Sequence, residues 1–182
     1  INIPTVELES DFTLRLEAPG EQELTLNELY DACAPSIVAI YGYVDGQTGY
    51  YWGSGVVLSE DGLILTNTHV INNCDRATVK LADNSEYEAK LVGADTISDI
   101  AVLKIDADGL TAASFGESKD LAVGDKVAAI GNPLGEAFRM TLTDGIISAI
   151  ERGVSYKGRS MTLLQTNTAI NEGNSGGALF NM

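Results

Sequence analysis

The sequence predicts an all-β protein whose strands form two lobes. From residue 36 onward, short runs rich in Val, Ile, Thr and Tyr alternate with turns rich in Gly, Asn and Asp. Strands that recur every 8–12 residues or so, with turn signals between them, are typical of β-barrels and β-sandwiches. A turn-rich stretch at residues 106–123 separates two such sets of runs. We therefore expect a first lobe at residues 28–112 and a second at residues 113–182.

The composition is that of a folded globular chain. Of the 182 residues, 45% are hydrophobic and 20% are charged, a mixture that can bury a sizeable core. No apolar run approaches the roughly 18 residues that a membrane-spanning helix needs. The 26 acidic residues outnumber the 11 basic ones, which gives a net charge of −15. Such a surface repels phosphate backbones and anionic lipid, so we expect neither nucleic acid nor a membrane surface as a partner.

Residues 1–27 show no sustained apolar periodicity and predict an acidic arm or linker. Pro4, Pro19 and Gly20 interrupt this segment. Its acidic side chains belong to Glu7, Glu9, Asp11, Glu17, Glu21 and Glu23. A short helix is expected at residues 26–32, because Pro35 disfavours helical backbone in the residue before it. The first residue is Ile1 rather than Met, so we expect the chain to be part of a longer gene product.

The strand runs differ in number between the two lobes. The first lobe has six, at residues 36–44, 50–59, 62–71, 77–83, 86–95 and 99–106. The second lobe has about four, at residues 125–132, 138–152, 159–167 and 176–180. No repeat is strict enough to indicate a solenoid.

The segment Gly173-Asn174-Ser175-Gly176-Gly177 is the most informative for chemistry. A serine between glycines can occupy a tight turn whose backbone N–H groups point to one spot, which supplies a nucleophile and an oxyanion hole. The alternative is an ordinary glycine-rich turn. The segment also fits the G-x-S-x-G motif of α/β-hydrolases, in which the acid and the histidine follow the serine. Only seven residues follow Ser175, and none is His, Asp or Glu, so that fold is excluded.

His69 and Asp99 are the candidate partners of this serine. His69 is the only histidine of the chain, and Asp99 directly precedes the apolar run at residues 100–105. Taken singly, each has a plain structural explanation, as a half-buried polar residue at a strand end or as a turn carboxylate. Together, the order His, Asp, Ser is that of chymotrypsin-type enzymes, whereas subtilisins have Asp, His, Ser. The combination predicts a catalytic triad of His69, Asp99 and Ser175.

The local sequences around these residues resemble the motifs of the HtrA (DegP-like) family of trypsin-fold serine proteases. Residues 66–71 resemble its histidine motif, residues 98–104 its aspartate motif and residues 173–177 its serine motif. Further resemblance is found at residues 52–56, 123–125, 129–133 and 143–148. It extends from about Tyr30 to the last residue and leaves only the acidic arm uncovered.

The resemblance implies two six-stranded antiparallel β-barrels with the triad in the cleft between them. It implies a serine endopeptidase that cleaves unfolded or misfolded polypeptides through an acyl-enzyme, in protein quality control. Asp99 would orient His69, the general base for Ser175, and the turn Gly173-Asn174-Ser175 would form the oxyanion hole. Neither a metal nor an organic cofactor is implied. A non-catalytic or chaperone-like peptide-binding module on the same fold stays open as the alternative.

The family also implies features outside the triad. An extracytoplasmic location in a bacterium, a homotrimer and a downstream PDZ domain are expectations from the resemblance. By the same resemblance Ala169 and Ile170 line the primary pocket. Since neither side chain is charged, we expect small or medium aliphatic side chains before the scissile bond.

Several residues depart from the pattern of the family. Glu172 and Ala178 stand where the family usually has Pro, and Asn167 stands where Asp is common, so the mobility of the oxyanion turn is in question. Asn174 stands where cleavage-activated relatives have an Asp that pairs with the new N-terminus. Because an amide cannot form that ion pair, we expect control by loop ordering and oligomerisation instead.

Two further hypotheses concern the end of the chain and the cysteines. A second lobe of four strands is an incomplete barrel, so we expect the sequence to be a fragment whose C-terminal strands are missing and which by itself is inactive or far slower than the complete domain. Cys33 and Cys74 make an even count in an exported protein, which favours a disulfide, with two free thiols as the alternative.

Overall fold

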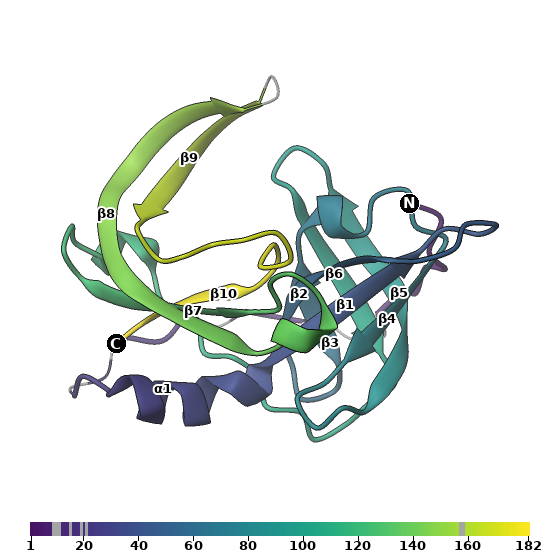
Figure 1. The fold of residues 1–182 in the computed structure, drawn as a ribbon, viewed down its shortest axis with the longest axis horizontal. Helices are drawn as coiled ribbons and strands as arrows, with labels where there is room; N and C mark the ends of the chain where they lie inside the picture. Colours follow the sequence, from purple (N-terminus) through teal and green to yellow (C-terminus); the bar gives the residue numbers. More distant parts are fainter. Residues whose placement is uncertain (9–11, 15, 19, 21, 157–158) are drawn as a thin grey trace.

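The structure, a computed structural model, describes residues 1–8, 12–14, 16–18, 20, 22–156 and 159–182. The predicted arm residues Glu9, Asp11, Pro19 and Glu21 lie outside the described residues. The architecture is almost entirely β, with a closed barrel and an open half-barrel side by side (Figure 1). The fold class predicted from the sequence is confirmed.

The first lobe is a closed barrel of six antiparallel strands in the order β1-β2-β3-β6-β5-β4. Alternate side chains of β4 and β6 point into the barrel, as the pleat of a strand requires. Val79, Ile64 and Leu103 are fully buried in its core. The strands are β1 Ile37–Tyr43, β2 Tyr51–Val57, β3 Leu63–Thr66, β4 Arg76–Lys80, β5 Glu86–Asp95 and β6 Ile100–Ile105.

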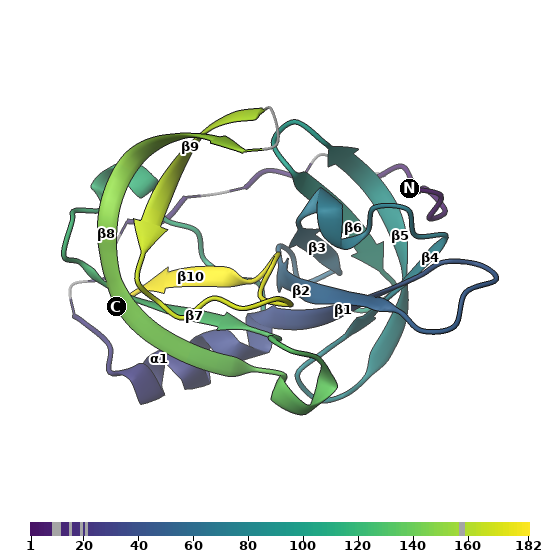
Figure 2. The same cartoon turned by 45° about the horizontal axis from the view of Figure 1, so that its top comes forward.

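The second lobe is an open sheet of four strands in the order β10-β7-β8-β9. The long strand β8 is strongly bowed along the outer side of the second lobe and forms a long hairpin with β9 (Figures 1 and 2). Two register shifts in this hairpin accompany the curvature. The strands are β7 Lys126–Gly131, β8 Thr141–Tyr156, β9 Arg159–Thr166 and β10 Ala178–Asn181.

Helices are short and lie outside the two sheets. The helix α1 (Leu26–Cys33) begins with a capping box between Thr25 and Glu28 and buries Leu29, close to the expected bounds. The 3₁₀-helices are η1 Ala34–Ser36, η2 Thr68–Val70, η3 Ser118–Asp120 and η4 Glu136–Phe138. No helix in the described part of the chain is long and apolar enough to cross a membrane.

The beginning of the acidic arm packs against the first barrel. The N–H of Val6 donates to the carbonyl of Leu91 in β5 (2.9 Å), and the N–H of Leu91 donates to the carbonyl of Pro4 (2.8 Å). Ile3 is 3% exposed and belongs to the apolar core of the barrel. Residues 3–6 therefore form part of the folded lobe.

The predicted disulfide is wrong, because both cysteines are free thiols. Cys74 lies in the core inside the first barrel, together with Val38 of β1. Cys33 packs against a second cluster outside that barrel, which contains Ile37 of the same strand. Successive side chains of a strand point to opposite faces, so the wall of the barrel separates the two thiols. Burial raises the pKa of both thiols.

Candidate active site

Strand pairing brings His69 and Asp99 together. His69 lies in η2, directly after β3, and Asp99 directly precedes β6. These strands pair antiparallel with Thr66 opposite Ala101, so the end of one meets the start of the other. His69 Nδ1 lies 2.6 Å from Asp99 Oδ2, and the backbone N–H of His69 donates to Asp99 Oδ1 (2.9 Å). One carboxylate thus holds both the imidazole and the backbone of His69.

The backbone of Asp99 is shaped for this contact. Its φ of 59° is in the left-handed region, which is uncommon for a residue with a Cβ. The carbonyl of Asp99 accepts from the Thr68 N–H (3.2 Å) and from Asn67 Nδ2 (2.8 Å). The His69 side chain is 56% exposed and that of Asp99 is 21% exposed. A carboxylate at Nδ1 favours the tautomer with the proton there, so Nε2 is left with a lone pair as a proton acceptor.

Ser175 lies in the second of two consecutive tight turns, at residues 171–174 and 174–177. The N–H of Asn174 donates to the carbonyl of Asn171 (3.1 Å), and the N–H of Gly177 donates to the carbonyl of Asn174 (2.8 Å). The third residues of these turns, Gly173 and Gly176, have φ of 96° and 84°, as type II turns require. Glycine is also needed for space. A Cβ on Gly173 would lie 2.4 Å from the Asn132 carbonyl oxygen, and one on Gly176 would lie 2.1 Å from that of Ser54.

The serine turn attaches to the first barrel close to His69. The carbonyl of Ser175 accepts from the N–H of Ser54 in β2 (2.8 Å). A Cβ on neighbouring Gly53 would lie 3.1 Å from the Ser175 carbonyl oxygen and 2.6 Å from Val70 Cγ1. Val70 directly follows His69, so the residue next to His69 and Ser175 itself border the same glycine. No hydrogen bond joins the side chains of Ser175 and His69 in the described structure, and such bonds are often loose in unliganded enzymes.

The candidate oxyanion turn presents two free donors. Within the described residues, the N–H groups of Gly173 and Ser175, on either side of Asn174, donate no hydrogen bond. The carbonyl of Gly173 is fixed on the opposite side, because Ser54 Oγ donates to it (2.8 Å). The hydroxyl of Ser54 in turn accepts from the backbone N–H of Asn132 (2.9 Å) and from its Nδ2 (3.1 Å). Both side chains are buried, so this polar contact beneath the turn is shielded from solvent.

Ser54 and Asn132, which contact each other and hold the serine turn through the Gly173 carbonyl, were not selected by motif reasoning. Both lie in segments that resemble the HtrA family, at residues 52–56 and 129–133. The sequence did offer a signal for each residue: Ser54 is a polar residue inside an otherwise apolar strand, and Asn132 is a polar residue directly after one. A buried polar side chain needs a hydrogen-bond partner, but the sequence does not say which.

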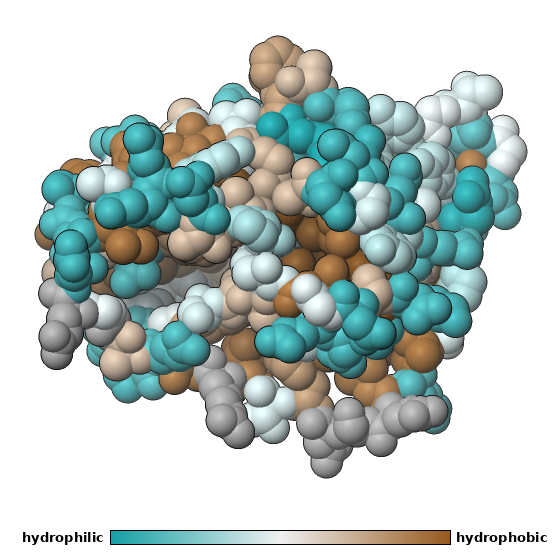
Figure 3. Space-filling view, turned by 90° about the horizontal axis from the view of Figure 1, so that it is seen from below, coloured by the Kyte–Doolittle hydropathy of each residue, from teal (hydrophilic) through white to brown (hydrophobic). Residues whose placement is uncertain are grey.

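Ala169 and Ile170, the expected pocket residues, are both exposed at the surface in this structure. The carbonyl of Ala169 accepts from Thr143 Oγ1 (2.9 Å), which ties the segment to β8. Ile170 is 62% exposed. A hollow of about 820 Å³ lies elsewhere, bordered by Phe115, Leu164 and Phe180 among others. Apolar side chains are also exposed on the face of the molecule that is seen from below in Figure 3, where they lie between hydrophilic ones.

The comparisons with known proteins identify the family. Residues 53–182 match the family model described as a trypsin-like peptidase domain. The chain therefore belongs to the trypsin-like peptidase family.

Similar proteins with descriptive names show to which group within the family the chain is most similar. Over 130 residues the chain is 52% identical to a probable periplasmic serine endoprotease, DegP-like, of Halomonas elongata, and 50% identical to one of Pseudomonas fluorescens. Each match covers 71% of this chain but 27% of the relative, so the chain spans about a quarter of the length of these relatives. Within the trypsin-like peptidases, the chain is of the HtrA (DegP-like) type.

Solved structures agree in fold. The HtrA-type protease AlgW with a tripeptide is 40% identical, with a TM-score of 0.77, over 83% of this chain and 48% of that one. The serine endoprotease from Yersinia pestis is also 40% identical, with a TM-score of 0.75, over 88% of this chain and 55% of that one.

Proposed function

We propose that this chain carries the catalytic centre of a serine endopeptidase, with His69, Asp99 and Ser175 as the triad. The observation that supports this most directly is the double contact of one carboxylate with the ring and the backbone of His69. A histidine oriented in this way is suited to proton transfer, and a serine on a glycine turn is suited to attack.

In the proposed reaction, Ser175 Oγ attacks the scissile carbonyl carbon while His69 Nε2 takes the hydroxyl proton. The negative charge that develops on the carbonyl oxygen is stabilised by the N–H groups of Gly173 and Ser175, which no described residue occupies. The C–N bond then breaks as His69 returns the proton to the leaving amine. Water, activated by the same imidazole, hydrolyses the acyl-enzyme and restores the serine.

The proposed substrates are unfolded polypeptides, as part of protein quality control outside the cytoplasm. The relatives are named periplasmic endoproteases, which supports the location. Because Ala169 and Ile170 offer no charge, cleavage should follow small or medium aliphatic residues rather than Lys or Arg. A homotrimer and a downstream PDZ domain belong to the same proposal and rest on family membership alone.

A fluorophosphonate probe tests the proposal, because it labels only activated serines. Labelling of the protein, lost in Ser175→Ala and in His69→Ala but kept in the control Ser118→Ala on the exposed η3, is the expected result. A wild-type protein that binds unfolded casein but stays unlabelled would instead favour the chaperone-like module.

A further inference from the structure

The loop between β7 and β8, residues 132–140, joins the serine turn to the first barrel. At its start, the backbone N–H of Leu134 donates to the carbonyl of Glu172 (2.8 Å), which lies in the first tight turn before Ser175. The carbonyl of Asn132 borders Gly173 in the same turn. This end of the loop therefore sets the position of the peptide that presents the Gly173 N–H.

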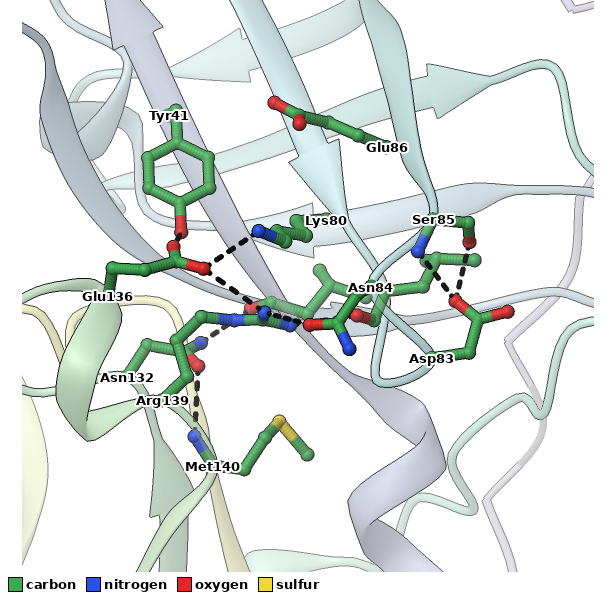
Figure 4. A network of polar contacts seen from close by, with 12 residues as sticks. Tyr41, Lys80, Asp83, Asn84, Ser85, Glu86, Asn132, Glu136, Arg139 and Met140 are labelled. Atoms are coloured by element: carbon green, nitrogen blue, oxygen red, sulfur yellow. Dashed lines mark hydrogen bonds and ion pairs between the residues drawn. The ribbon is translucent and has the colours of Figure 1, made fainter.

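Two charged side chains of the loop, Glu136 and Arg139, hold its other end to the first barrel (Figure 4). Glu136 accepts from Lys80 Nζ of β4 (2.7 Å) and from the hydroxyl of Tyr41 of β1. Arg139 donates through Nη2 to the carbonyl of Leu81 (2.8 Å) and through Nη1 to Asn84 Oδ1 (2.9 Å).

At neutral pH the Glu136 carboxylate stays charged and the Tyr41 hydroxyl stays neutral. Lys80 first and the Tyr41 hydroxyl second hold the pKa of Glu136 below its usual range, so the carboxylate is ionised. Burial, reinforced by the hydrogen bond to Glu136, raises the pKa of Tyr41, which therefore stays a neutral donor. The side chain of Arg139 is only 10% exposed, and its contact with the Leu81 carbonyl is partly buried, whereas its contact with Asn84 lies at the surface.

The backbone between the two ends is strained. Leu134 and Met140 have φ of 56° and 60°, a region that residues with a Cβ disfavour. Such conformations persist only where surrounding contacts enforce them. The N–H of Met140 is held by Asn132 Oδ1 (3.1 Å), whereas Leu134 depends on the Glu172 carbonyl and on the anchored segment that follows it. Release of the anchors should let Leu134 relax and withdraw from Glu172.

We propose that Glu136 and Arg139 are positioning residues for the oxyanion turn, which they hold by fixing the loop at residues 132–140 on the first barrel. The inference rests on the proposed function of Ser175. Arg139 contacts Leu81 and Asn84 in the turn between β4 and β5, residues 81–85. The loop thus transmits the position of this turn to Gly173, and so determines whether the Gly173 N–H can donate to the negatively charged carbonyl oxygen that forms in the reaction. The two side chains touch neither the substrate nor the reacting atoms.

The test compares Arg139→Met and Glu136→Gln with a matched control, Glu23→Gln, in the full-length protein. Glu23 also accepts from a lysine (Lys126 Nζ, 2.6 Å) and is similarly exposed, but that pair lies at the opposite end of β7. A displaced catalytic group costs about a hundredfold in rate, and partial displacement costs less. We expect fluorophosphonate labelling and kcat to fall about tenfold to a hundredfold in Arg139→Met and about threefold to tenfold in Glu136→Gln, with KM changed less than twofold. Arg139→Lys, which keeps the charge, should recover part of the rate.

Amide hydrogen exchange gives a readout that does not depend on activity. Exchange in peptides covering residues 132–140 and 170–177 should accelerate in Arg139→Met and Glu136→Gln but not in Glu23→Gln. If wild type is labelled and the variants match it within twofold in rate and exchange, the inference is overturned while the proposed function stands. If wild type is unlabelled, the proposed function fails, and unchanged exchange would still overturn the anchoring role. Circular dichroism separates both outcomes from global unfolding.

Discussion

Removal of the Ser54 hydroxyl tests the buried contact beneath the oxyanion turn. In Ser54→Ala, the Gly173 carbonyl and the Asn132 N–H lose their partner, and Ser54 itself is 0% exposed. A buried polar group without a partner costs about 1–3 kcal/mol. We expect the two groups together to lower the free energy of unfolding by about 3 kcal/mol, because water that enters the vacated space hydrogen-bonds them in part. For a chain of this size, about 2–4 °C per kcal/mol corresponds to a fall of about 6–12 °C in Tm.

Thermal unfolding followed by circular dichroism measures this loss, and fluorophosphonate labelling measures its effect on Ser175. Labelling should fall together with stability, because the Gly173 peptide is no longer fixed. The control is Ser85→Ala, which removes a hydroxyl that donates to Asp83 in an exposed turn and should shift Tm by less than 2 °C. If Ser54→Ala melts and labels like this control, the buried contact does not hold the turn, and the reasoning fails.

Three further predictions follow from named contacts. Asp99→Asn should lower kcat by about three to four orders of magnitude with little change in Tm, because the amide favours the wrong tautomer of His69; an intact rate would contradict the triad. Ile3→Ala should destabilise the protein by about 2–4 kcal/mol in thermal unfolding, since Ile3 is 3% exposed in the barrel core, and a loss below 0.5 kcal/mol or so would show that the arm is dispensable. The folded-state pKa of Glu136 is lowered, so its contribution to stability is full above the unfolded-state pKa and is lost as the pH falls through the folded-state pKa. The difference in Tm between wild type and Glu136→Gln should therefore shrink as the pH falls from 6 toward 3, and a difference that grows would contradict the sign.

Local sequence patterns determine much of this protein. Alternating apolar residues specify the strands, because a pleated strand sends successive side chains to opposite faces. The pair Thr25 and Glu28 specifies the start of α1, because a capping box closes within four residues of the chain. The order and the local motifs of His69, Asp99 and Ser175 are also readable from the sequence, since motif and order involve no distance.

Only the tertiary structure decides which distant residues meet. The contact between Ser54 and Gly173 joins residues 119 positions apart, and the ion pair of Lys80 and Glu136 joins residues 56 apart. Their proximity depends on closure of the barrel and on the way in which the second sheet docks on it, which no local pattern encodes. The same limit explains the wrong disulfide: an even cysteine count says nothing of which face of β1 each thiol occupies. The wall of the barrel separates Cys33 from Cys74, and the pairing of β3 with β6 in the same barrel brings His69 to Asp99.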